Sequence, residues 1–363
     1  MKPSMLLPDE VSSEAKTSLT KKMRDQRITL AHGSGGKAMR GLIETLFVRT
    51  FNNPVLEALE DQAVFPLQEL SQHGHRLAFT TDSYVVHPLF FPGGNIGELA
   101  VNGTVNDLAV SGARPLYLSC SMIMEEGLAM ESLAQIVLSM KQAADQAGVA
   151  IVTGDTKVVE RGSADKLFIN TAGIGIIPEG ICISVHGARP GDAIVTNGFI
   201  GDHGVAILLA RNELALESNV ESDTQSLNDL IAKMLTVCPD IRCMRDATRG
   251  GVATVLNEFA AAAGVSMYVH ESAIPMREPV RGACEILGLD PLYLANEGKL
   301  VAIVPQERAE QLVATMQRHP AGTHSAIIGT VKVSPAGTVL LSTTFGGTRI
   351  VDTLVGEQLP RIC

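Results

Sequence analysis

The stretch HRLAFTTDSYVV at residues 75–86, followed by IGELAVNGTVNDLAVSGA at residues 96–113, carries the clearest fold signal in this sequence. The first segment is an apolar run that ends in polar residues, which predicts a strand entering a turn. The second places Val101, Val105 and Leu108 at helical spacing and has Gly112 near its end, which predicts a helix. Strand and helix together predict a mixed α+β unit.

The mixed pattern continues through the chain. Residues 130–148 predict an amphipathic helix, and the runs that follow it predict strands. A turn-rich segment separates this half from a second half with similar patterns, so we predict two consecutive α+β domains. The predicted divisions are a polar leader at 1–27, an N-terminal domain at 28–177, a C-terminal domain at 178–345 and a mobile tail at 346–363.

The composition of the chain excludes several classes of function. The chain has 363 residues and a formal net charge of −10, which makes it a poor default partner for nucleic acid or an anionic membrane. No apolar run approaches the ~20 residues that a bilayer span needs. There are six cysteines and no CxxC pair, so we expect reduced thiols and a cytoplasmic protein rather than a zinc site or disulfides.

A glycine-rich loop, HGSGGKAM at residues 32–39, precedes a helical pattern. Gly33, Gly35 and Gly36 would let backbone N–H groups approach a phosphate, and Lys37 would add positive charge. The loop is not a P-loop, because alanines stand where that motif needs a glycine and a hydroxyl residue. A flexible turn before a helix is the alternative.

Three acidic positions in the first half share one setting. Asp82 ends an apolar strand, Asp107 follows Asn106 on the predicted helix, and Asp155 follows another strand two residues before Lys157. A carboxylate at the edge of an apolar element needs a compensating charge, and Mg²⁺ with phosphate supplies one. Each aspartate alone fits a turn or cap role equally well, but three together favour a metal-nucleotide site.

The second half adds polar motifs of lower specificity. RDATRGGV at 245–252 opens a helix, where Asp246 is either an N-cap or part of an anion site. ANEGKL at 295–300 places Glu297 in a turn, as a ligand, a base or a simple turn residue. His203, in GDHGV at 201–205, is more often structural than catalytic when it has no visible partner.

The sequence ends in LPRIC at residues 359–363, which places the thiol of Cys363 at its end. A thiolate there would be a nucleophile able to visit more than one protein. Its own α-carboxylate disfavours ionisation while Arg361 favours it. Without the other motifs, an incidental terminal residue would be the simpler interpretation.

Taken in order, these motifs resemble the HypE family of hydrogenase maturation proteins, within the superfamily of aminoimidazole ribonucleotide synthetase and selenophosphate synthetase. The resemblance runs from about residue 28 to Cys363. It implies a two-domain PurM-like fold whose N-terminal domain dimerises through a shared β-barrel, with ATP and Mg²⁺ in a cleft. By motif, Asp82, Asp107 and Asp155 would bind the metal. The nucleotide would be bound by the glycine loop together with Lys37, Asn106, Lys157 and Asp246. The catalytic residues around Cys363 would be His203, Arg249 and Glu297.

The implied reaction explains a thiol in this position. Members of the family receive a carbamoyl group on this cysteine from HypF. They dehydrate it to a thiocyanate with ATP and deliver cyanide to iron on the HypC–HypD complex. Phosphorylation turns a poor oxygen leaving group into phosphate. The alternatives are a selenophosphate synthetase-like enzyme, which needs a cysteine in the glycine loop that this chain lacks, and a non-catalytic nucleotide-binding adaptor.

Overall fold

The computed structural model describes residues 25–59, 62–211, 218–353, 359 and 361–363. The described helices of the first half are α2 (Lys37–Leu42), which continues through a π-helical turn (Ile43–Val48) into α3 (Arg49–Phe51), α4 (Pro54–Glu57), α5 (Leu67–Ser71), α6 (Ile96–Val110) and α7 (Met130–Ala147). Its strands are β1 (Arg76–Tyr84), β2 (Phe90–Phe91), β3 (Gly94–Asn95), β4 (Arg114–Glu125), β5 (Ala150–Val159) and β6 (Leu167–Ile177).

The second half alternates shorter elements. Its helices are α8 (Asp202–Ala210), α9 (Asn228–Val237), α10 (Gly251–Ala263), α11 (Glu278–Leu287) and α12 (Gln306–Met316). Its strands are β7 (Ala193–Thr196), β8 (Cys243–Asp246), β9 (Ser266–His270), β10 (Leu300–Val304), β11 (Ala326–Lys332), β12 (Thr338–Ser342) and β13 (Thr348–Ile350). The predicted domain boundary after residue 177 falls between β6 and β7.

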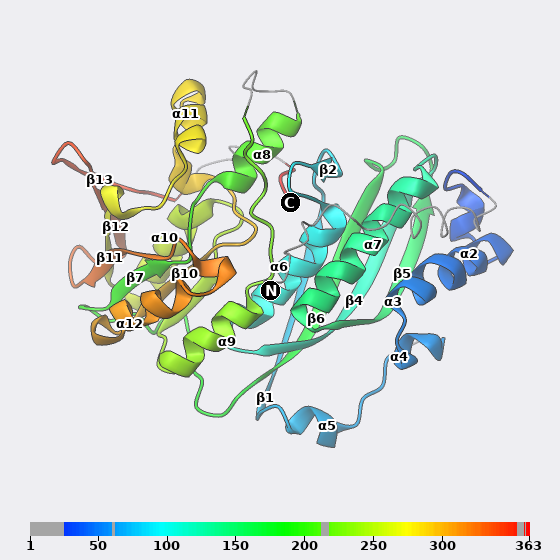
Figure 1. Ribbon diagram of the computed structural model, residues 1–363, viewed down its shortest axis with the longest axis horizontal. Helices are drawn as coiled ribbons and strands as arrows, with labels where there is room; N and C mark the ends of the chain where they lie inside the picture. Colours follow the sequence, from blue (N-terminus) through cyan, green and yellow to red (C-terminus); the bar gives the residue numbers. More distant parts are fainter. Residues whose placement is uncertain (1–24, 60–61, 212–217, 354–358, 360) are drawn as a thin grey trace, which may run out of the picture.

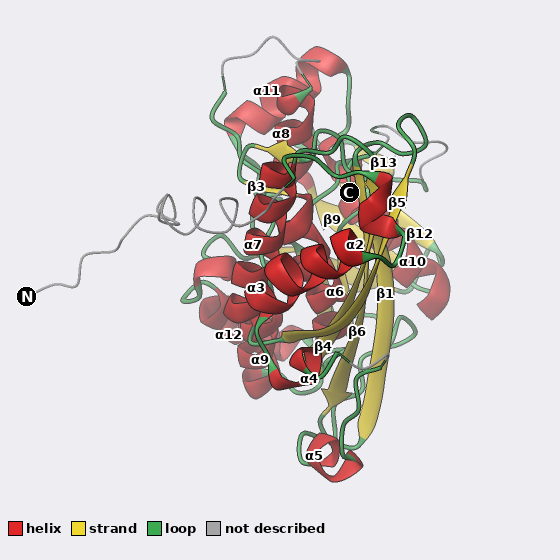
Figure 2. Ribbon diagram, turned by 90° about the vertical axis from the view of Figure 1, so that its right-hand side faces the viewer, coloured by secondary structure: helices red, strands yellow, loops and turns green. Residues whose placement is uncertain are grey.

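The first domain is a four-stranded sheet with helices on one face. The strand order is β1-β6-β4-β5, antiparallel except for the β4–β5 pair. Helices α6 and α7 lie against one face, here called the inner face, and Figure 2 shows β1 at the edge of the sheet. The opposite, outer face keeps Leu77 (61% exposed) and Phe79 (68% exposed) in contact with solvent.

The second domain is a seven-stranded sheet of order β13-β12-β9-β11-β7-β10-β8. Strand β10 is buried along its whole length because alternate side chains enter two cores. Val301 and Ile303 pack toward α10, and Leu300, Ala302 and Val304 pack toward α9 and α12. Part of the segment predicted as tail belongs to this sheet, since β13 pairs with β12.

Helix α6 joins the two domains. Nearly every residue in it is buried, because it contacts the first sheet, α7, α9 and β8. Figure 1 shows it at the centre of the molecule. Its N-cap is Asn95, whose side chain accepts hydrogen bonds from the next turn. Within the described residues no helix is long and apolar enough to cross a bilayer.

Candidate active site

The C-terminal segment, residues 361–363, lies in the seam between the domains, near α8 and β2 (Figure 1). It adds backbone pairing beyond the end of β1. The Val85 N–H donates to the carbonyl of Cys363 over 3.0 Å, and the His87 N–H donates to the carbonyl of Arg361 over 3.2 Å. These two bonds fix the position of Cys363 in the described structure.

Ile362 is anchored by both its side chain and its backbone. The side chain is 4% exposed and joins the core of the first domain. Its carbonyl accepts a hydrogen bond from Nε2 of His203 (2.8 Å), whose Nδ1 lies 2.8 Å from the Ser222 hydroxyl. Because a carbonyl only accepts, Nε2 carries the hydrogen, and Nδ1 accepts from Ser222 in the neutral ring. Burial lowers the pKa of His203, which favours that neutral form. His203 therefore holds the backbone next to Cys363.

The thiol of Cys363 sits among charged side chains. Burial is the main cause that raises its pKa well above the ordinary thiol value, and the negative charges of Glu297, Asp82 and Asp246 raise it further. Arg249 acts in the opposite direction. In this position the sulfur is protonated at neutral pH and is a weak nucleophile.

Asp82, Asp107 and Asp246 come together from β1, α6 and β8. Burial raises the pKa of Asp246 to about 7, and the charges of Asp107 and Asp82 add to that shift. Burial also raises the pKa of Asp107, against a 3.0 Å hydrogen bond that its carboxylate accepts from Thr80. The carboxylates disfavour one another's charged forms, which is the state that a cation would relieve.

Glu297 is the most deeply placed of these acids. It is 3% exposed, and its Oε1 has no hydrogen-bond partner among the described residues. Its pKa is raised well above the ordinary value by burial first, then by the charges of Asp223 and Asp246. A carboxyl group in this state has an oxygen available for an incoming group and binds a proton tightly.

A cleft of about 600 Å³ opens beside this cluster. Asp82 and Asp107 line it from the first domain, and Arg245, Asp246 and Arg249 line it from the second. The volume is that of an ordinary small-molecule site. Asp82, Asp107, Asp246 and Arg249 therefore meet at one inter-domain cleft. Asp82, Asp246 and Arg249 are also close enough to Cys363 to shift the pKa of its thiol.

Asp155 and Lys157 lie elsewhere in the same subunit. In the sheet register Asp82 aligns with Thr171 and Gly154, so Asp155, one residue further along β5, points to the opposite face. Asp82 is on edge strand β1 and Asp155 on the other edge strand, β5. The Asp155 carboxylate pairs with Lys157 Nζ at 2.8 Å, and both side chains are largely exposed.

The glycine-rich loop packs beside that second group. A Cβ on Gly33 would come within 2.7 Å of the Val158 backbone nitrogen, so the close approach to β5 requires glycine. Gly35 has φ +76°, which also favours glycine, and Lys37 begins α2. The structure thus groups Gly33, Gly35, Gly36 and Lys37 with Asp155 and Lys157 at β5 and not with Asp82.

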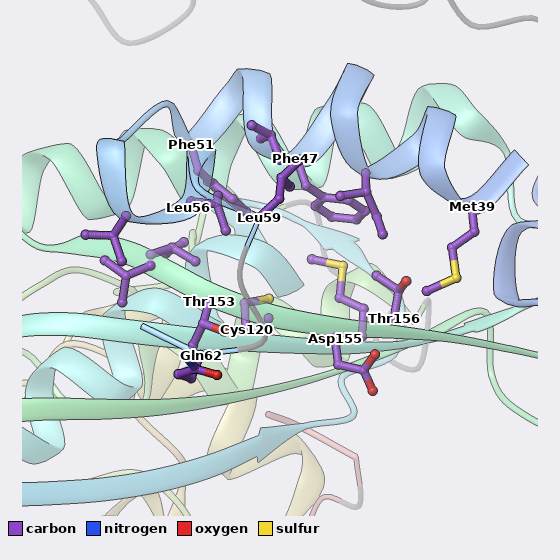
Figure 3. Close-up of a pocket in the computed structure, with 17 residues that line it drawn as sticks. Met39, Phe47, Phe51, Leu56, Leu59, Gln62, Cys120, Thr153, Asp155 and Thr156 are labelled. Carbon is purple, nitrogen blue, oxygen red and sulfur yellow. The ribbon is translucent and has the colours of Figure 1, made fainter. Parts of the chain in front are cut away.

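Figure 3 shows a cavity of about 390 Å³ at this edge of the domain. Its wall is mainly apolar, with Phe47 and Phe51 above the sheet and Cys120 on it. Asp155 borders this cavity, but its carboxylate points away from it, below the strands in Figure 3.

Asn106, a predicted nucleotide contact, is engaged with the second half of the chain. Its Oδ1 accepts from the Leu227 N–H (2.7 Å) and its Nδ2 donates to the Gln225 carbonyl (3.0 Å). This side chain therefore ties α6 to the segment before α9.

Sequence patterns did not identify Asp223. Its carboxylate pairs with Lys299 Nζ at 2.9 Å, and both side chains are buried. It also accepts from the Glu297 N–H (3.0 Å) and so holds that residue in place. Burial would raise its pKa, but Lys299 and the hydrogen bonds lower it overall. Asp223 stands in a short polar stretch without periodicity. Only the structure, which places it beside Lys299, identifies it as part of the site.

Both halves of the chain also match known protein families. Residues 59–177 match the N-terminal domain, and residues 189–342 the C-terminal domain, of AIR synthase related proteins. Fold and site thus define a two-domain protein of the AIR synthase class. The chain is 54% identical over 341 residues to carbamoyl dehydratase HypE of Azotobacter vinelandii, which covers 94% of this chain and 98% of that protein. The chain belongs to the HypE family.

Solved structures give the same result. A crystal structure of hydrogenase maturation protein HypE in complex with ATP has a TM-score of 0.87 and 52% identity, covering 92% of this chain and 99% of that one. A crystal structure of a HypE–HypF complex has a TM-score of 0.75 and 47% identity, covering 86% of this chain and 99% of that one. The PurM-like two-domain fold expected from the motifs is confirmed.

Proposed function

We infer that this protein is an ATP-dependent carbamoyl dehydratase that acts on a carbamoyl group carried by its own Cys363. The observation that carries this conclusion is the docked position of Cys363 near Glu297, Asp82 and Asp246, of which Asp82 and Asp246 line a cleft of about 600 Å³. The HypE relatives named carbamoyl dehydratase and the ATP-bound HypE structure support the substrate and the nucleotide. The S-cyanide product supplies the cyanide ligands of the [NiFe]-hydrogenase iron.

The reaction needs no redox partner. The oxygen of the S-carboxamide attacks the γ-phosphorus of ATP, and the bond from that phosphorus to ADP breaks. The nitrogen then loses its two protons and forms a triple bond to carbon as the C–O bond breaks. The oxygen leaves with the phosphate. The net change is S-carboxamide plus ATP to S-cyanide, ADP, phosphate and a proton.

Glu297 is the group best placed to accept a proton from the nitrogen. It lies close enough to Cys363 to shift the pKa of the thiol, and its Oε1 has no partner among the described residues. A raised pKa makes its ionised form a stronger base than an ordinary carboxylate. Arg249 lies near both groups and opposes their negative charge.

The acidic cluster suits Mg²⁺, which takes one or two carboxylates together with phosphate oxygens. In the described part of the chain no three potential ligand side chains converge closely enough to hold an ion by themselves. Asp82, Asp107 and Asp246 would hold the ion with the help of ATP. Bound there, it would neutralise phosphate charge during phosphoryl transfer.

Asp155, Lys157 and the glycine loop fit this site through a second copy of the chain. They lie on the outer face or at the β5 edge, away from Asp82 of the same subunit. A homodimer joined through the outer faces, as the family's shared barrel would be, brings one copy's β5 toward the other's β1. Each cleft would then combine Cys363 of one copy with Lys157 of the other.

Mixed dimers test this arrangement. Cys363→Ala and Lys157→Ala copies should each be inactive alone. Co-expressed with different tags and purified as the mixed dimer, they should recover up to half of the wild-type dehydration. Recovery is expected only if Lys157 acts on the other copy's Cys363. A mixed dimer as inactive as its parents would place Lys157 in its own copy's site, and an active Lys157→Ala parent would place it outside the reaction.

HypF, as in the HypE–HypF complex structure, would load Cys363, and the HypC–HypD complex would receive the cyanide. Both exchanges fit a cytoplasmic protein. A time-resolved mass measurement tests the reaction. The protein is incubated with HypF, carbamoyl phosphate and ATP, and its mass is followed over time. We expect a carbamoyl adduct on Cys363 that forms first and then loses one water. An adduct that persists would support the adaptor and refute the dehydratase.

A further inference from the structure

A set of side chains outside the cleft holds the docked C-terminal segment. Asp165, in the turn before β6, forms an ion pair with the guanidinium of Arg361. The same carboxylate lies 3.2 Å from Nδ1 of His87. Burial, followed by the charge of Arg361, lowers the pKa of His87, so Arg361 is the principal cationic partner of Asp165.

Arg211, just after α8, closes the group from the other side. Its Nε donates to the His87 carbonyl (2.8 Å) and its Nη2 donates to the Arg361 carbonyl (2.7 Å). It therefore bridges the two paired backbone stretches. Arg361 itself has φ +56°, a conformation that non-glycine residues rarely adopt and that surrounding contacts must maintain.

We propose that Asp165 and Arg211 are positioning residues that latch Arg361, and that this latch sets how often Cys363 leaves the cleft. The proposal rests on the function above, because the same thiol must be loaded by one protein and dehydrated in its own cleft. Docked, the thiol is half-buried and its segment is held by backbone hydrogen bonds. Released, it becomes fully accessible. Neither latch residue touches the reacting atoms.

The first test needs no partner protein. Cys363 is alkylated with iodoacetamide, and its rate is compared by mass spectrometry with that of Cys182, which is exposed and serves as an internal standard. Asp165→Asn should speed alkylation of Cys363 about two- to fivefold, the range of a partly exposed ion pair. Arg211→Met, which loses two charged hydrogen bonds, should speed it about tenfold or more.

Matched variants distinguish loss of the latch from a general loss of stability of the folded protein. Asp165→Glu keeps the charge and should restore most of the slow rate. Asp145→Asn, which removes an exposed ion pair with Lys141 on α7, should leave both rates unchanged. Equal Cys363 rates in wild type, Asp165→Asn and Arg211→Met would overturn the proposal. A parallel rise at Cys120, which is buried, would do the same, since it would indicate general unfolding.

The second test uses the two half-reactions. Releasing the segment should speed carbamoylation by HypF and slow dehydration of the preloaded adduct, by similar factors in Asp165→Asn. A merely structural defect would slow both, and that result would count against the latch. If wild type itself is never carbamoylated, the proposed function fails, while the alkylation result still decides the latch.

Discussion

At the scale of single residues, the site is dominated by carboxyl groups that the fold holds away from water. The pKa of Asp246 is about 7, and that of Glu297 lies well above its ordinary value, in both cases mainly through burial. The sequence motifs identified these residues but could not predict their protonation states, because the pKa shifts come from burial and from neighbours on other elements. Asp223 and Asp165 were missed for the same reason: their partners are distant in sequence.

Asp246→Asn should flatten the dependence of stability on pH. The folded-state pKa, about 7, lies above the ordinary aspartate value of 3.8, so the folded protein binds this proton more tightly. Stability is therefore full below about pH 4 and falls as the pH rises toward 7. Without nucleotide or Mg²⁺, the variant should be about 2–4 kcal/mol more stable than wild type at pH 8, with little difference at pH 4. Urea unfolding at both pH values measures this. A gain of equal size at both would contradict the assignment.

Glu297→Gln should slow dehydration of the carbamoyl group without slowing its transfer to Cys363. Glutamine has nearly the same shape but accepts no proton, so dehydration should slow at least ~100-fold. Carbamoylation by HypF should remain close to wild type, because Glu297 has no role in that transfer. Single-turnover conversion of the preloaded adduct is the measurement. Dehydration at the wild-type rate would exclude Glu297 as the base.

At the scale of elements, periodic patterns were a good guide. The structure confirms the predicted helix at 96–113 as α6 and the one at 130–148 as α7, each ending within a few residues of the expected position. The predicted strand at 75–86 is β1. Docking of residues 361–363 had no such signal, because it rests on backbone hydrogen bonds and on one buried isoleucine. The strand β13 was missed because its side chains are exposed and show no alternation.

Gly103 in α6 should be intolerant of alanine. A methyl group there would collide with the hydroxyl oxygen of Tyr84, at the end of β1 next to Asp82. Gly103→Ala should therefore cost about 1–3 kcal/mol of unfolding free energy, although alanine is otherwise the better helix former. Adding Tyr84→Phe removes the colliding atom and should recover most of the loss. Denaturant unfolding measures both.

The control for Gly103 is Gly282 in α11, where an added methyl group meets no atom within 4 Å. Gly282→Ala should be neutral or slightly stabilising. If Tyr84→Phe fails to rescue Gly103→Ala, the collision is not the cause of the loss.

At the scale of the whole molecule, the sheet of the first domain is covered by helices on one face only. Helices cover the inner face, while the outer face carries exposed Leu77, Phe79 and Ile123. Apolar side chains gathered on one sheet face are characteristic of an interface. The sequence could predict this sheet and, by resemblance, a dimer. It could not predict that Asp155 and Lys157 lie on the outer face of the sheet while Asp82 lies on the inner face, since those positions follow from the strand register.

Phe79→Lys should convert the proposed dimer into a monomer and abolish dehydration if each cleft needs the other copy's Lys157. Burying a lysine charge against a second copy costs several kcal/mol. Light scattering during size-exclusion chromatography gives the mass. Ile286→Lys, at an exposed position on α11, is the matched control and should leave the mass unchanged. A Phe79→Lys protein that keeps the wild-type mass would refute the interface.

The uncovered sheet also has a consequence for the life of the newly made chain. Within the described residues of a lone copy, β1 and β5 each lack a strand partner on one side, and exposed apolar side chains lie on the sheet face between them. Such a surface invites aggregation until a second copy covers it. Soluble yield should then fall with crowded, rapid synthesis and improve with slow expression, and the melting temperature should climb as the protein is concentrated.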